Sequence, residues 1–163
     1  MSNYSSKKSF GYTLLETLIV ISISVLLFSI VYANYRDFSR RQILEEVAKQ
    51  VVSDLRLAQE YALAGRKEAS CITLTGYEFE RTATTGYRIN DVCTSGGGTE
   101  IKAITLPTDI QIGNFSPAPS RFTFRVLARG TDRNGDISFT LTQVSTGRTK
   151  TITISKNGNI TIS

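Results

Sequence analysis

Two basic side chains near the end of the chain could bind phosphate. Arg148 and Lys150 lie two residues apart in the sequence Gly-Arg-Thr-Lys. Residues two apart on a β-strand point to the same face, so both cations could contact neighbouring phosphates of a nucleic acid. Positive charge also keeps an exposed edge strand soluble, and the segment fits that structural role too. Both interpretations stay open.

The positive charge of the chain is concentrated around this segment. The 163 residues include 19 Lys and Arg against 14 Asp and Glu, a formal net charge of +5. Seven basic and two acidic residues fall within 121–163, namely Arg121, Arg125, Arg129, Arg133, Arg148, Lys150 and Lys156 against Asp132 and Asp136. If this part of the chain binds nucleic acid through Arg148 and Lys150, we expect Lys156 and Arg129 to lie at the margin of the contact.

Oxygen ligands at alternate positions raise the question of a calcium site. Asp132, Asn134 and Asp136 surround Gly135 with a spacing that calcium loops use. No glutamate follows at the distance that a twelve-residue calcium loop requires, and Asn-Gly by itself predicts a hairpin turn. We therefore expect no resident metal ion or cofactor, with these three residues as the one candidate calcium site.

Catalytic groups are scarce. The sequence has no histidine, which removes the commonest general base, the usual metal ligand and every serine–histidine triad. It also lacks a glycine-rich phosphate loop. Glu78 and Glu80 are at strand spacing near Arg81, which favours a solvated polar face over a pair of catalytic carboxylates. The sequence predicts a protein that is not an enzyme.

Glu16 stands at the start of a long apolar stretch. From Thr17 to Tyr35 nineteen residues carry no charge, and as a helix they nearly cross a hydrocarbon core of about 30 Å. Lys7 and Lys8 precede the stretch, so the positive-inside rule predicts a cytoplasmic leader and an exported remainder. A carboxylate at the centre of a bilayer costs about 2.5–3.5 kcal/mol, so Glu16 requires a partner.

A secretory signal and a single-pass membrane anchor are two ordinary explanations of this N-terminal region. A secretory signal would be cleaved near Val31-Tyr32-Ala33, which has the small residues of such a site. A single-pass anchor would stay uncleaved. Neither explains Glu16, and the helical pattern continues well beyond Ala33.

Export places the two cysteines in an oxidising compartment. Cys71 and Cys93 are the only cysteines, and we expect them to pair. Closing a loop of about 20 residues would stabilise the fold by about 3 kcal/mol in the chain-entropy model. Two buried free thiols remain the alternative, because the sequence does not fix their separation.

Beyond the apolar stretch the helical period continues. No proline occurs before Pro107, so one helix is expected from about Tyr12 to Ala64, ending near Gly65. The expected apolar stripe is Ile43, Val47, Val51, Leu55, Ala58 and Ala62. The expected polar face is Arg41, Glu45, Lys49, Asp54 and Arg56.

From Cys71 onward, short β-branched runs alternate with turn residues. This pattern predicts an antiparallel sheet, and Asn157-Gly158 predicts a two-residue hairpin turn near the end of the chain. The fold class expected is α+β, with a long N-terminal helix packed on β-structure.

The N-terminal residues carry a family resemblance. Gly11-Tyr12-Thr13-Leu14-Leu15-Glu16, behind Lys7 and Lys8, resembles the class III signal of type IV pilins and type II secretion pseudopilins, with Tyr12 where phenylalanine is usual. The resemblance implies that prepilin peptidase cuts between Gly11 and Tyr12 and methylates the amine of Tyr12. It also implies that Glu16 pairs with the N-terminal amine of a neighbouring subunit during assembly.

The β-half is similar to the GspH/FimT branch of minor pilins and pseudopilins. Gly-Arg-Thr-Lys resembles the Gly-Arg-x-Arg element by which some FimT-like competence pilins bind DNA, with Lys150 in place of the second arginine. The implied function is a minor pilin or pseudopilin, a structural subunit at the initiation or tip of a type IV pilus or type II secretion pseudopilus. The alternative is a DNA-binding minor pilin for DNA uptake in natural transformation.

The resemblance also implies an order of segments and a location. We expect a cleaved leader at 1–11, a transmembrane helix at 12–35, its amphipathic continuation at 36–66 and a β-rich extracytoplasmic head at 67–163. The protein would be a single-pass inner-membrane protein with a periplasmic or extracellular head that enters a filament. Its partners would be other pilin subunits, prepilin peptidase and the inner-membrane assembly platform.

Overall fold

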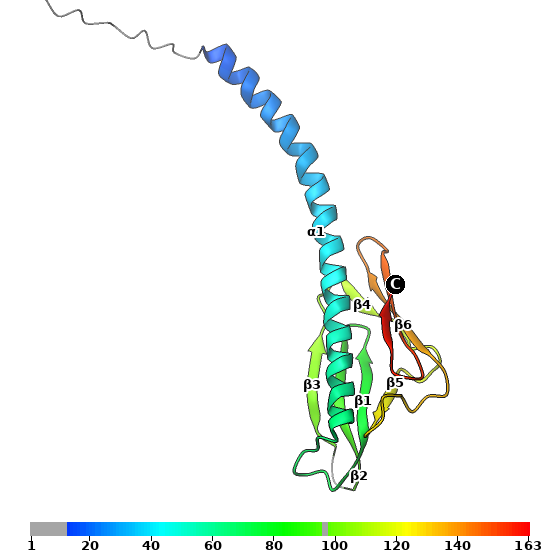
Figure 1. The fold of residues 1–163 in the computed structure, drawn as a ribbon. Coiled ribbons are helices and arrows are strands. Elements are labelled where there is room, and N and C mark those ends of the chain that lie inside the picture. Colours follow the sequence, from blue (N-terminus) through cyan, green and yellow to red (C-terminus); the bar gives the residue numbers. More distant parts are fainter. Residues whose placement is uncertain (1–12, 96–97) are drawn as a thin grey trace, which may run out of the picture. The chain divides into compact units, whose positions relative to one another are not determined.

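The computed structural model describes residues 13–95 and 98–163 (Figure 1). The chain divides into two compact units with the boundary between Arg41 and Gln42. Helix α1 (Leu14–Ala64) contributes residues to both units. The second unit also contains the eight strands found in the described part of the chain.

Capping residues define both ends of α1. At its start the hydroxyl of Thr13 accepts a hydrogen bond from the backbone N–H of Glu16 at 3.2 Å. At its end the N–H of Gly65 donates to the carbonyl of Ala62 and that of Arg66 to the carbonyl of Tyr61, both at 3.1 Å. This bonding pattern is a Schellman motif, and it needs the left-handed φ of +59° that Gly65 adopts at low cost. The expected end of the helix near Gly65 is therefore observed.

The surface of the first unit is largely apolar. From Leu14 to Phe28 every apolar side chain is more than half exposed. The hydroxyls of Ser22, Ser24 and Ser29 each donate to a carbonyl four residues earlier at 2.8 Å, so these polar groups are satisfied within the helix. Over residues 13–95 and 98–163 the structure contains no helix that combines the length and apolar character needed to cross a membrane.

The β-strands of the second unit form two antiparallel sheets of four strands each. The first has the order β3-β2-β1-β5, from strands β1 (Thr73–Ala83), β2 (Gly86–Ser95), β3 (Glu100–Thr105) and β5 (Arg121–Arg125). The second has the order β4-β6-β7-β8, from strands β4 (Ile110–Ile112), β6 (Ile137–Gln143), β7 (Thr149–Ile154) and β8 (Ile160–Ile162). The α+β class is confirmed, and the β-structure expected as one sheet is two.

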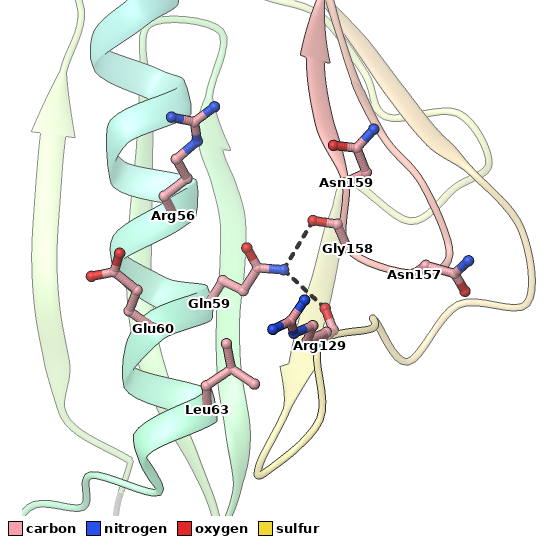
Figure 2. Close-up of a pocket in the computed structure, with 8 residues that line it drawn as sticks. All are labelled: Arg56, Gln59, Glu60, Leu63, Arg129, Asn157, Gly158 and Asn159. Atoms are coloured by element: carbon pink, nitrogen blue, oxygen red, sulfur yellow. Dashed lines mark hydrogen bonds between the residues drawn. The ribbon is translucent and has the colours of Figure 1, made fainter.

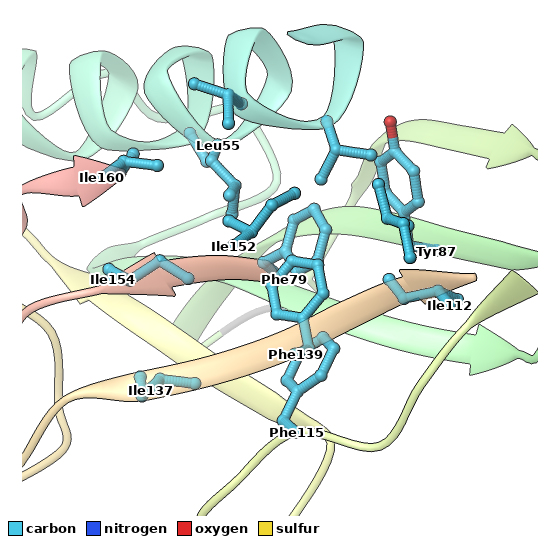
Figure 3. Packing of buried hydrophobic residues seen from close by; sticks show 14 of the residues in the cluster. Leu55, Phe79, Tyr87, Ile112, Phe115, Ile137, Phe139, Ile152, Ile154 and Ile160 are labelled. Atoms are coloured by element: carbon cyan, nitrogen blue, oxygen red, sulfur yellow. The ribbon is translucent and has the colours of Figure 1, made fainter. Parts of the chain in front are cut away.

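The core lies where both sheets meet the helix (Figure 3). Leu55 of α1, Phe79 of β1, and Ile152 of β7 are all fully buried. Around Phe79 the aromatic rings stack, with ring centroids 4.9 Å from Tyr87 and 6.1 Å from Phe139. Period-two alternation puts these residues on the inner faces, so the apolar pattern of the strands is what joins the two sheets.

The expected apolar stripe of α1 is confirmed at five of its six residues, Val47, Val51, Leu55, Ala58 and Ala62, all of which are buried. Two positions differ from the expectation. Leu44 is buried, whereas Ile43 is 39% exposed, and Asp54, expected on the polar face, is only 4% exposed. The Asp54 carboxylate accepts hydrogen bonds from the Tyr87 hydroxyl at 2.8 Å and from Lys102 Nζ at 2.6 Å. Burial, with this bond to Asp54, raises the pKa of Tyr87. A buried carboxylate is tolerated here because two donors compensate it.

The turn between β7 and β8 is longer than the sequence predicts. The N–H of Ser155 donates to the carbonyl of Asn159, and the N–H of Gly158 donates to the carbonyl of Ser155, both at 2.8 Å. Three residues therefore lie between the paired positions, with Gly158 alone at a positive φ of +82°. This is the three-residue hairpin in which glycine takes the left-handed position, and the two-residue turn predicted here is wrong.

Candidate functional site

The predicted assembly residue lies in the first turn of α1. Glu16, Thr17, Val20 and Ile21 line a groove on the helix surface in the first unit. Within the described part of the chain, no cation forms an ion pair with the Glu16 carboxylate. The predicted cleavage site, Gly11 and Tyr12, lies outside the described residues.

A disulfide joins Cys71 and Cys93, whose Cα atoms are 5.7 Å apart, so the expected pairing is confirmed. The bond ties the segment before β1 to strand β2. Asp91 beside it is 2% exposed, and its carboxylate accepts a hydrogen bond from the N–H of Thr99. Among the described residues these three side chains form the one group with metal-ligand geometry, but its sulfurs are bonded to each other and offer no thiolate.

The aspartates of the candidate calcium loop bind backbone amides. Asp132 Oδ1 accepts from the N–H of Thr123 at 2.9 Å, which fixes the loop to β5. Asp136 Oδ1 accepts from the N–H of Lys156 at 3.1 Å, which fixes it to the β7–β8 turn. Asn134 is exposed between them. These bonds give both carboxylates a structural role.

The Arg148–Lys150 pair lies at the beginning of β7. Lys150 lies on the same face of β7 as the buried Ile152 and Ile154, because residues two apart on a strand share a face. Its side chain therefore points to the side of the core. Its Nζ lies 3.5 Å from Glu45 Oε2 of α1, and Arg148 is half-buried. The local pattern predicted a shared face but could not show that this face is turned toward the helix.

Arg129 and Lys156 line a different surface, an open concavity of about 470 Å³ beyond the far end of β7. Arg125 and Arg133 line it as well. The structure thus brings Arg129 and Lys156 together and places them apart from the beginning of β7. The four-residue spacing of Arg125, Arg129 and Arg133 was the signal in the sequence that could have indicated this cluster.

A second concavity, of about 410 Å³, adjoins the first and shares Arg129 and Asn157 with it (Figure 2). It lies between α1, which contributes Arg56, Gln59 and Glu60, and the β7–β8 turn. No local motif could have indicated these helix residues, because tertiary packing alone brings them to the C-terminal part of the chain.

Gln59 links the helix wall of this second concavity to the opposite wall by hydrogen bonds. Its Nε2 donates to the carbonyls of Arg129 and Gly158, each at 2.9 Å, as Figure 2 shows. Gly158 approaches so closely that a side-chain Cβ would overlap the Arg129 carbonyl oxygen. The absence of a side chain at Gly158 therefore lets the turn and the Arg129 loop meet on the helix.

No protein-family model matches the sequence, and no curated protein matches it. Among solved structures, the type IV minor pilin FimU of Pseudomonas aeruginosa strain PAO1 is similar, with a TM-score of 0.59 and 17% sequence identity over 77% of this chain and 92% of that chain. The chain therefore has a pilin fold, in which the end of a long N-terminal helix packs against antiparallel β-structure.

Proposed function

We propose that this protein is a minor pilin or pseudopilin, a structural subunit at the initiation or tip of a type IV pilus or a type II secretion pseudopilus. The pilin fold shared with a type IV minor pilin is the observation that carries the proposal. Its role would be structural and not catalytic. In keeping with this, Glu78 and Glu80 pair with Arg121 and Arg88 of neighbouring strands.

The proposal includes the maturation that the N-terminal signal implies. Prepilin peptidase would remove residues 1–11 and methylate the amine of Tyr12. The helix from residue 12 to 35 would then anchor the chain in the inner membrane until the assembly platform extracts it into a filament. The disulfide between Cys71 and Cys93 supports an oxidising compartment for the head, because disulfides persist there.

Contacts with other pilin subunits would cover the first unit. Its helix exposes a continuous apolar surface, and large exposed apolar surfaces mark contacts with proteins or membranes. Glu16 stands at the beginning of this surface, where the amine of a neighbouring Tyr12 could neutralise it. A carboxylate among apolar residues is stable only with such a partner.

Replacement of Glu16 by alanine tests this function. We expect Glu16→Ala to accumulate in the membrane at the wild-type level, because the apolar stretch that follows is long enough to insert. We expect the variant to be missing from sheared filaments, because the charge that receives the neighbouring amine is gone. Immunoblots of the two fractions measure both quantities.

Glu46→Ala is the matched control, because Glu46 is also an exposed helix glutamate but belongs to the second unit. It should enter filaments normally. Filament levels of Glu16→Ala equal to those of the wild type would contradict the proposed role of the carboxylate.

A second candidate function is DNA binding for uptake in natural transformation. Arg125, Arg129 and Lys156, which form no ion pair with any described residue, lie together and favour it, whereas Lys150 already has Glu45 as a partner. The two functions share one fold and one route of maturation. Direct measurement of DNA binding by the purified protein separates them.

A further inference from the structure

We propose that the two adjoining concavities form one basic groove that binds the sugar–phosphate backbone of a nucleic acid. We call this surface the Arg129 groove and define it by Arg56, Gln59, Arg125, Arg129, Lys156 and Asn157. The inference rests on the second candidate function. It places the contact away from the Gly-Arg-Thr-Lys segment, where the sequence had suggested it.

Charge is the first support for the Arg129 groove. Five cations line the two concavities, against the single carboxylate of Glu60. In the described part of the chain, none of Arg56, Arg125, Arg129 and Lys156 forms an ion pair. The carboxylates of the neighbouring Asp132 and Asp136 accept hydrogen bonds from backbone amides. Four unpaired cations in one place leave a positive field that phosphates can neutralise with release of counterions.

The lining of the groove favours a nucleic acid over an acidic protein. Leu63 and Ala128 are its only apolar side chains among the described residues, and none of the lining residues is aromatic. The centre of a protein–protein interface normally buries apolar and aromatic side chains. Interfaces with nucleic acids are more polar and more positively charged, and amides such as that of Asn157 donate to phosphate oxygens.

The backbone that carries the cations is held in place before any ligand binds. Gln59 fixes the carbonyls of Arg129 and Gly158 to the helix. On the other side of the loop, the Arg133 guanidinium donates to the carbonyls of Ala118 and Pro119 at 3.2 Å and of Arg121 at 2.6 Å. Arg133 is therefore a positioning residue, and binding loses little free energy in ordering the loop.

The lining of the groove predicts how its affinity for DNA depends on salt and on whether the DNA is single- or double-stranded. The groove offers no aromatic side chain on which the bases of a single strand could stack, so duplex and single strands should bind with similar affinity. If the four unpaired cations each contact a phosphate, log Kd should change with log salt with a slope of about 3 to 4. Each cation that is removed should lower that slope by about one.

Fluorescence anisotropy of the full-length protein in detergent micelles tests the proposal, with a labelled mixed-sequence DNA duplex as the probe. We expect Arg129→Ala/Lys156→Ala to weaken binding at least about tenfold and to lower the salt slope by about two. The variant Arg148→Ala/Lys150→Ala removes the same charge and should bind as the wild type does. Matching Tm values would show that both variants are folded.

If Arg129→Ala/Lys156→Ala does not fold, the single change Arg125→Gln replaces it, because Arg125 is exposed and has no side-chain bond among the described residues. It should lower the slope by about one.

Three outcomes would overturn the proposal. They are equal losses of DNA affinity in both double variants, a loss confined to Arg148→Ala/Lys150→Ala, and no binding of DNA by the wild type at low salt. Polyglutamate that competes as strongly as DNA would point to an acidic protein instead.

Filament entry of the same variants distinguishes failure of the DNA-binding proposal from failure of the proposed structural function. Arg129→Ala/Lys156→Ala should enter sheared filaments at the wild-type level, whereas Glu16→Ala should keep its DNA binding and fail to enter filaments. A groove variant that loses both properties would mean that the groove serves assembly, which also overturns the proposal.

Discussion

Gly158 and Gln59 show how single residues join parts of the chain that are far apart in sequence. The amide of Gln59 reaches the carbonyl of Gly158 across a sequence separation of 99 residues. The position of a turn at Asn157-Gly158 could be predicted from the sequence, because the dipeptide itself favours one, although the turn has three residues and not the two predicted. Its contact with Gln59 could not, because no local pattern encodes which helix residue a turn will face.

At the residue scale we predict that Gly158→Ala destabilises the second unit. The substitution would force a left-handed φ on alanine and bring its Cβ into the Arg129 carbonyl oxygen. We expect the free energy of unfolding in urea to fall by more than about 2 kcal/mol. Gly135→Ala is the control, since a Cβ there meets nothing within 4 Å. Equal stability of the two variants would contradict this account of the turn.

At the scale of elements, Asp54 fixes α1 to the first sheet through the Tyr87 hydroxyl and the Lys102 ammonium. Asp54 follows Val51 by three residues and precedes Ala58 by four, so helical spacing alone puts it on the buried face. Its residue type predicted the polar face, and that prediction was wrong. The deciding partners lie 33 and 48 residues away, where helix periodicity carries no information.

The same contact predicts how stability depends on pH. Burial and the hydrogen bond to Asp54 raise the pKa of Tyr87, so the folded state keeps a proton that the unfolded state releases above about pH 10. Stability is therefore fully present below that pH and is lost as the pH rises further. The pKa of Tyr77 is also raised, chiefly by burial, so both tyrosines contribute.

Urea unfolding at a series of pH values above 10 measures this dependence. We expect Tyr87→Phe to be less stable than the wild type at neutral pH and to lose less stability as the pH rises. Tyr35→Phe, which changes an exposed tyrosine of the first unit, is the control and should follow the wild-type curve. A Tyr87→Phe curve parallel to that of the wild type would show that the hydroxyl does not couple folding to pH.

At the scale of the whole molecule, the fold class could be predicted from the change in hydrophobic period along the chain. The helical spacing up to Ala64 and the alternation after Cys71 predicted a helix followed by antiparallel strands, and that class is confirmed. The division into two sheets could not be predicted, because alternation assigns a strand its faces but not its neighbours. The 17% identity with FimU fits this view, because a fold tolerates wide substitution when its pattern is kept.

The central claim is that this chain matures and assembles as a pilin. Intact-mass analysis of the protein recovered from sheared filaments tests the claim most directly. We predict a chain that begins at Tyr12, carries one methyl group on its amine and contains the disulfide between Cys71 and Cys93. Absence of the chain from filaments, or a chain that begins at Met1 or Asn34, would contradict the claim.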